Sequence, residues 1–319
     1  MFFRMSPFFS KSRQPGWLAI LPHDGGVTLA HVVRQPHSRP ELRRLANYAV
    51  GKGERDDALS RLRTAHRLKS YACTTLMADG EYNVTPLDAP AVPPEERKEA
   101  LRWSLKEMVS YPVDSACIDL LDIPSAGLAP GRTAGVLVVS AAEAVVRARV
   151  APFEAARIRL AAVDIPELAQ RNVAALLEDE NRGLAFLRLD ERGMMLTLTF
   201  HGELIAVRRG EMSTLQLNGG SEEMRARVRE RLGLELQRSL DNFDRQYSHI
   251  PISKVVLACS PLVDGLTAAL AESSYVPVHE MDLAPVIDFA ALPDFCDTQC
   301  QARNLLAIGA ALRLEEVAA

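Results

Sequence analysis

The sequence predicts an α/β fold in two lobes, and three observations lead to this prediction. The chain has 319 residues, which is too long for one typical core and short for three. Two segments, 17–34 and 182–212, carry strand patterns separated by tight-turn residues. Each of them precedes a stretch in which helical and extended patterns alternate, and this order, occurring twice, indicates two α/β lobes.

The first half of the chain opens with a hairpin. "WLAILPH" and "GVTLAHVVR" are extended patterns that turn at Asp24-Gly25-Gly26. A helix is predicted to begin at Pro93-Pro94, where no amide proton is needed, and to end at Tyr111-Pro112, with Leu101, Leu105 and Met108 on one face. The other predicted elements are strands over 41–50, 70–78, 116–123 and 134–141, and helices over 55–68 and 142–156.

The second half begins with "RIRLAAVDIPELAQRNVAALL", a strand that leads into a helix, and we place the lobe boundary near residue 160. A hairpin series over 182–212 and a long helix over about 221–247 follow. The helix carries an apolar stripe at spacings of 4, 4, 3 and 4 that predicts core packing, made of Leu232, Leu236, Leu240, Phe243 and Tyr247. Strands are predicted over 252–259 and 276–282, a helix over 261–272, and an apolar closing helix over 302–314.

The charge of the chain excludes one broad class of function. Its formal net charge of −4 argues against a general nucleic-acid binder. The distribution is uneven, because residues 1–70 hold 13 Lys/Arg against 5 Asp/Glu, and residues 271–319 hold 2 against 8. The basic part is either a solvated face or a surface that lies against anionic lipid.

The cysteines and the chain start indicate a compartment. Five scattered cysteines fit a reducing cytoplasm, and Cys296 and Cys300 lack the further ligands of a zinc site. The sequence has no run of about 18 uncharged apolar residues, the length that a membrane-spanning helix needs. Residues 1–14 have two Phe pairs among basic residues but no signal-peptide core, so they predict either a weak interfacial anchor or an unanchored tail.

Several segments resemble one known family. "EALRWSLKEMVSYPVDSACIDLLDIP" resembles a helix, turn and strand of the PilM family of type IV pilus assembly proteins. "AAVDIPELAQRN" and "LELQRSLDNFDRQY" are similar to its MSHA biogenesis branch, MshI, and "LLAIGAALR" is similar to the family's C-terminal helix. The resemblance implies an actin-like (ribonuclease H-like) fold with a central cleft. The first lobe would span 15–160, with 301–319 returning to it, and the second 161–300.

The resemblance also implies where an actin-like ATPase would hold its nucleotide, which is at two hairpins and a glycine-bearing loop. In the family the first hairpin reads like Gly-Ile-Asp-Ile-Gly-Ser-Ser, whereas here Leu21 or Pro22 falls at the acid and Asp24 lies late, in the turn. The second hairpin keeps Asp190, but Glu191 and Arg192 replace small residues. The third loop has Pro261 and no glycine pair. We therefore expect no catalytic residue, no bound cofactor and no metal.

Three hypotheses for the function remain. The first is a non-catalytic cytoplasmic scaffold of an MSHA-like pilus platform, docked peripherally on the inner membrane. Its partner would be the cytoplasmic N-terminal peptide of a bitopic PilN-like protein, and the pilus assembly ATPase is a second candidate partner. The alternatives are an active ATP-binding protein of the same fold, and a cytoplasmic domain of the type II secretion L kind. A membrane-spanning helix after residue 319 would favour the latter, and the sequence ends in "LEEVAA" without one.

Two further features have open interpretations. Arg208 and Arg209 stand at a predicted strand end, as solvated charge or as a contact for an acidic partner surface. Asp119 and Asp122 flank a predicted strand and have no basic partner in obvious register.

Overall fold

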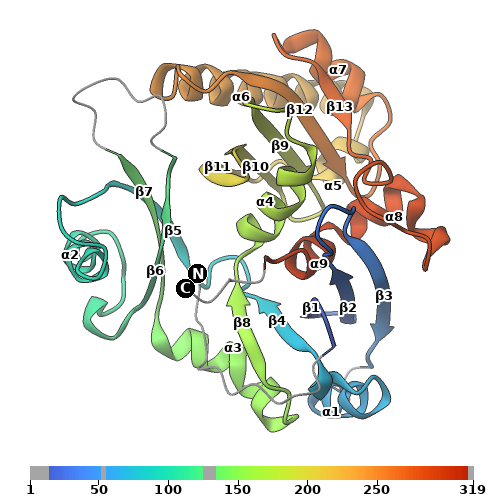
Figure 1. Cartoon of the computed structure of the whole chain (residues 1–319). Coiled ribbons are helices and arrows are strands. Elements are labelled where there is room, and N and C mark those ends of the chain that lie inside the picture. The colour runs from blue at the N-terminus through green and yellow to red at the C-terminus, as the bar shows by residue number, and fades with distance from the viewer. Residues whose placement is uncertain (1–13, 52–54, 125–133, 315–319) are drawn as a thin grey trace.

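The computed structural model describes residues 14–51, 55–124 and 134–314, and in this part of the chain two five-stranded sheets form two lobes (Figure 1). The first sheet has the order β3 (Glu41–Ala49), β2 (Gly26–Val33), β1 (Trp17–His23), β4 (Ala72–Leu76) and β8 (Leu160–Asp164). The second has the order β11 (Glu203–Gly210), β10 (Met194–Phe200), β9 (Gly183–Leu189), β12 (Ile252–Cys259) and β13 (Val278–Glu280).

The two sheets repeat one topology. In the first, β1 pairs antiparallel with β2 and parallel with β4, and in the second β9 pairs antiparallel with β10 and parallel with β12. Each hairpin has a glycine beside its third strand. A Cβ at Gly26 would lie 1.9 Å from the Tyr48 carbonyl oxygen, and one at Gly193 would lie 2.4 Å from that of Gly210. These two glycines therefore permit close strand approach in both lobes.

The longer helices form three layers, one on the outer face of each large sheet and one between the two sheets. Figure 1 shows α1 (Arg55–Ala65) and α3 (Glu143–Ala155) below the first sheet, and α6 (Glu222–Gln246) and α7 (Leu266–Ser273) above the second. Between the sheets lie α4 (Pro166–Leu177) and α9 (Leu305–Ala311), which pack on each other. Successive side chains of β1 point to opposite faces of the first sheet. Leu18 and Ile20 join the core with α1 and α3, while Ala19 joins the central core.

The predicted fold class, a two-lobed actin-like α/β fold, is confirmed, and so is the apolar stripe of α6. All five residues of that stripe are buried. The first hairpin turns at Asp24-Gly25, as predicted. The lobe boundary near residue 160 needs a correction, however. Strand β8 lies after it and pairs with β4, so the first sheet extends to Asp164.

A third, smaller sheet was not predicted as a unit. It has the order β5 (Asn83–Asp88), β7 (Gly135–Ala141) and β6 (Cys117–Asp122), and α2 (Arg97–Ser104) covers one face of it. Strand β5 falls in a segment that carries Pro86, and proline is accepted there because β5 is an edge strand. Helix α2 ends earlier than predicted, and Met108 is 56% exposed instead of packing with Leu101 and Leu105.

The C-terminal segment returns to the first lobe. After β13 the chain pairs with edge strand β3, because the Leu42 amide donates to the Asp288 carbonyl and the Asp288 amide to that of Pro40. The predicted closing helix is two helices, α8 (Thr298–Arg303) and α9, which meet at Asn304. Helix α9 packs on β1 and β2.

The remaining short helices are α5 (Thr214–Asn218), η1 (Leu68–Ser70), η2 (Val113–Ser115) and η3 (Pro293–Cys296). Within the residues described, no helix has the length and apolarity to span a membrane. The predictions made for residues 1–13 lie outside this part of the chain.

Candidate functional site

The three loops predicted for a nucleotide come together between the lobes. The Ser260 amide in the third loop donates to the Leu189 carbonyl, 3.0 Å away, at the start of the second hairpin. Burial lowers the pKa of His23 in the first hairpin, and the positive charge of Arg192 in the second hairpin lowers it further. The first and second turns are therefore close enough to interact electrostatically.

The backbone groups of Gly25 in the first turn already have hydrogen-bond partners within the chain. The Gly25 amide donates to His23 Nδ1 at 3.2 Å, and the Gly25 carbonyl accepts from Val50. Leu21 packs against the central core, so the position where an acid would be needed is apolar. Asp24 lies exposed in the turn itself. This hairpin therefore presents neither a free Gly25 amide nor an inward carboxylate for a phosphate or its metal ion.

The second turn is closed by its own carboxylate. Asp190 Oδ1 accepts from the amides of Arg192, at 2.8 Å, and Gly193, at 3.2 Å. Its Oδ2 accepts from Arg188 Nη1 at 2.7 Å. The amides that would approach a phosphate are thus bonded to an anion of the chain itself. The sequence showed the acid but not its role in the turn. An Asp side chain that accepts a hydrogen bond from the backbone two residues further along is, however, a common turn pattern.

The third loop leaves little space. Pro261 has no amide proton, and its carbonyl accepts from Cys259 Sγ at 3.3 Å. The cavity between this loop and α8 is lined by residues such as Val263, Glu280 and Gln299 and measures about 20 Å³. This volume accommodates roughly one water molecule. No group of three or more His, Cys, Asp or Glu that could hold a metal ion occurs in the described ranges.

A larger cavity lies elsewhere, between the three-stranded sheet and α4. It measures about 720 Å³, in the range of binding pockets for small ligands or short peptide segments. We call it the groove. Its apolar lining comes from both walls and from the residues after α9, and includes Leu120, Leu121, Ile123, Pro124, Leu168 and Leu314. Figure 1 shows the two walls, with β5, β6 and β7 on one side and α4 on the other.

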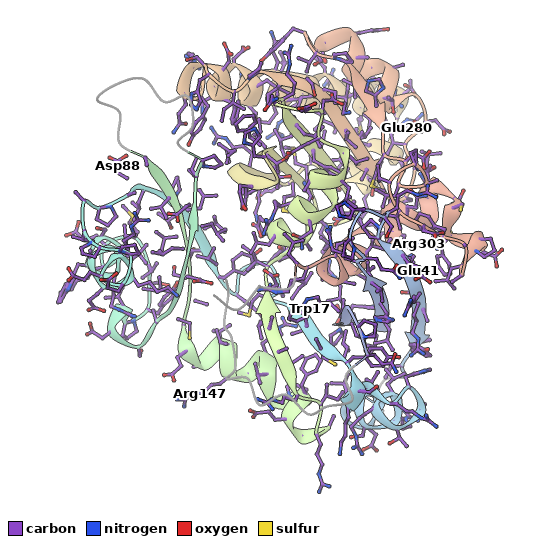
Figure 2. The ribbon with its side chains drawn as sticks, viewed as in Figure 1. Trp17, Glu41, Asp88, Arg147, Glu280 and Arg303 are labelled. Atoms are coloured by element: carbon purple, nitrogen blue, oxygen red, sulfur yellow. The ribbon has the colours of Figure 1, made fainter. Side chains whose placement is uncertain are left out.

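Three ion pairs line the groove. Arg97 bonds Asp122 at 3.2 Å, Arg171 bonds Glu203 at 3.3 Å, and Arg313 bonds Asp164 at 2.5 Å. The Arg313 guanidinium also lies 5.3 Å from the ring centre of Trp17, which Figure 2 shows in the middle of the molecule. The groove therefore combines apolar side chains with charges that balance one another.

One wall of the groove ends in a strand edge. Strand β6 is an edge of the three-stranded sheet, and its residues Leu120 to Asp122 line the groove. The Ile123 amide donates to the carbonyl of Gly135, the first residue of β7, and hydrogen-bonded pairs alternate along an antiparallel ladder. The backbone groups of Leu120 and Asp122 therefore point away from β7, toward the side where another strand can pair.

Two open interpretations are resolved by long-range contacts. Asp119 has Lys98 as its partner at 2.8 Å, and Asp122 has Arg97, so α2 supplies the cations that the strand register did not reveal. Arg209 is partly solvated, with a side chain that is 37% exposed, but it also bonds Glu167, which is 1% exposed. Arg208, its neighbour, is exposed as well.

Comparisons with known proteins identify solved structures with a similar fold. No protein-family model matches the chain, and no curated protein does. Among solved structures, a chain of a "PilM-PilN type IV pilus biogenesis complex" is 19% identical, with a TM-score of 0.72 over 93% of this chain and 98% of that one. At this identity the likeness shows a shared fold.

Two further structures are more distant. A Bacteroides thetaiotaomicron protein with an actin-like ATPase fold is 12% identical, with a TM-score of 0.48 over 94% of this chain and 99% of that one. The cytoplasmic domain of EpsL, an inner-membrane component of the Vibrio cholerae type II secretion system, is 12% identical, with a TM-score of 0.44 over 82% and 96%.

Proposed function

We propose that this chain is a non-catalytic adaptor of a type IV pilus assembly platform, a PilM-like protein of the MshI branch. It acts in the cytoplasm at the inner membrane and is held there by a partner. The similar solved chain comes from a complex of PilM with PilN, and its fold extends over 93% of this chain. That partnership, with the sequence resemblance, supports a PilN-like partner here. The pilus assembly ATPase remains a second predicted partner with no surface assigned to it.

The groove is the observation that carries the proposal. It is about 720 Å³ in volume, has apolar residues on both walls, and has the edge of β6 along one of them. An extended peptide can pair its backbone with a strand edge while its alternate side chains enter apolar pockets. A short cytoplasmic N-terminal peptide with apolar residues at alternate positions is the ligand that this chemistry fits.

The proposal is tested with a synthetic peptide carrying the cytoplasmic N-terminal segment of the bitopic membrane protein encoded beside this chain. Immobilised on beads, it is expected to retain the full-length protein, with a dissociation constant on the order of micromolar, about −8 kcal/mol. A peptide of the same composition in scrambled order is the control. Equal retention by both peptides contradicts specific binding.

We also propose that the chain performs no phosphoryl transfer. Such chemistry needs a metal-bound acid and amides aimed at the phosphates. Here the Asp190 carboxylate is bonded to Arg188 and to two amides of its own turn, and the cavity beside the third loop is about 20 Å³. Arg192 is the one feature that favours a phosphate, but Glu191 stands beside it and repels one.

The expected result is that Mg-ATP binds no tighter than about millimolar, roughly −4 kcal/mol. Isothermal titration of the purified chain with Mg-ATP measures this directly, and a thermal-shift series over the same concentrations is the second readout. A micromolar dissociation constant, or release of phosphate above the rate of a buffer blank, contradicts the proposal and favours the ATP-binding alternative.

A further inference from the structure

A polar cluster joins three parts of the molecule near the groove. Its members are Asp79, Tyr82, Glu167 and Arg209, and we call it the interlobe cluster. Asp79 and Tyr82 lie in the chain between β4 and β5, Glu167 opens α4, and Arg209 lies near the end of β11 in the second lobe. The segment that links the first sheet to the three-stranded sheet, the central layer and the second sheet therefore each contribute a group.

Glu167 is the centre of the cluster. Its side chain is 1% exposed, and Arg209 bonds its Oε1 through Nε at 2.9 Å and through Nη2 at 2.5 Å. Tyr82 donates its hydroxyl to the other oxygen, Oε2, at 2.5 Å. Both oxygens of a buried carboxylate are thus satisfied, which is the condition under which a buried charge is tolerated.

Arg209 extends the cluster across the lobes. Its guanidinium also bonds the Asp79 carboxylate and the Tyr82 hydroxyl, and it lies 5.3 Å from the Tyr82 ring centre. Burial alone would lower the pKa of Arg209, but Glu167 and Tyr82 outweigh it and raise the pKa, so the guanidinium keeps its charge. One cation of the second sheet therefore bonds Asp79, between β4 and β5, and Glu167, on the helix between the two large sheets.

The cluster also connects the elements that carry the two walls of the groove. Tyr82 directly precedes β5, which belongs to the sheet wall, and Glu167 directly precedes Leu168, which lines the α4 wall. Their hydrogen bond ties one wall to the other at this end. Arg171 and Asn172, which line the groove one turn further along α4, move with Glu167 if the helix moves.

We propose that Arg209 is a positioning residue that couples closure of the two lobes to the shape of the groove. Ligands commonly bridge the lobes of hinged proteins and hold them closed. In this chain the interlobe cluster performs that bridging with charges of its own, and the lobes stay closed without a nucleotide. This inference rests on the proposed function for its effect on peptide binding, but not for its effect on the lobes.

The test measures the lobes and the peptide separately. Spin labels are attached at Ala65→Cys on α1 and Ala268→Cys on α7, two exposed positions on helices at opposite ends of the molecule in Figure 1. Cys296 and Cys300 are replaced by Ser, because they are the accessible cysteines in the described residues. Double electron–electron resonance gives the distribution of interlobe distances, and the synthetic peptide described above gives a dissociation constant.

We expect a single narrow distribution that Mg-ATP does not change. Arg209→Ala and Glu167→Gln should each broaden and shift the distribution and weaken peptide binding by about tenfold. Arg208→Ala removes a neighbouring exposed arginine and should leave both readouts unchanged. Circular dichroism confirms that each variant is folded.

Two results overturn the inference. One is a distance distribution for Arg209→Ala that equals that of Arg208→Ala. The other is a broadened distribution with unchanged peptide affinity, which contradicts the proposed coupling between lobe closure and the groove. If the unmodified chain binds no peptide, the proposed function fails, while the distance measurement still decides whether the cluster holds the lobes.

Discussion

Gly309→Ala is expected to destabilise the chain by at least about 3 kcal/mol, because α9 has no space for a side chain at this position. A Cβ there would lie 2.0 Å from the Ala169 carbonyl oxygen and 2.6 Å from its carbon, and both atoms belong to the backbone of α4. The clash can be relieved only by separating the two central helices. That movement also strains the hydrogen bond from Asn172 to the Gly309 carbonyl, 2.9 Å long.

Urea unfolding followed by circular dichroism measures the effect as a lower midpoint. The matched control is Gly25→Ala, where the nearest atoms to the new Cβ are in the His23 ring at 3.5 Å, an ordinary contact. The control should unfold within about 0.5 kcal/mol of the parent chain. A Gly309→Ala variant with the parental midpoint shows that α4 and α9 are not as closely packed as the structure has them.

Leu121→Asp is expected to weaken peptide binding by at least about tenfold while the chain stays folded. Leu121 is half-buried on β6 and lines the groove, so the substitution places a carboxylate on the surface that would receive an apolar side chain. Binding a peptide there would remove water from this charge without giving it a partner. The free chain leaves it partly hydrated, so stability should fall by only about 1–2 kcal/mol.

Met224→Asp is the matched control for this substitution. It makes a similar apolar-to-acidic change on α6, where Met224 is 60% exposed and does not line the groove. Isothermal titration with the synthetic peptide should give the parental affinity for this variant. Equal losses for Leu121→Asp and Met224→Asp, or no loss for Leu121→Asp, contradict the placement of the peptide in the groove.

Local patterns were sufficient to predict most of the elements. The turn at Asp24-Gly25 and the stripe of α6 depend on spacings within one segment, and both were predicted correctly. Strand β5 was missed because Pro86 and the following "LDAPAVPPEE" conceal an extended pattern. Strand β8 was assigned to the wrong lobe because its pairing with β4 depends on the fold and not on the strand itself.

The candidate sites depend on contacts that no local pattern encodes. Arg313 meets Asp164, 149 residues away, and Arg209 meets Asp79, 130 residues away. The sequence could flag Asp190 as an acid in a degenerate loop, but not that its carboxylate bonds the amides of its own turn. The groove exists only after the three-stranded sheet is set opposite α4.

The central claim is that this chain binds a partner peptide in the groove and does so without nucleotide. Isothermal titration of the purified protein with the synthetic peptide, once in EDTA and once in saturating Mg-ATP, tests both parts together. We expect the same dissociation constant in the two buffers and no binding heat from Mg-ATP alone. Peptide binding that appears only with Mg-ATP, or no peptide binding in either buffer, contradicts it.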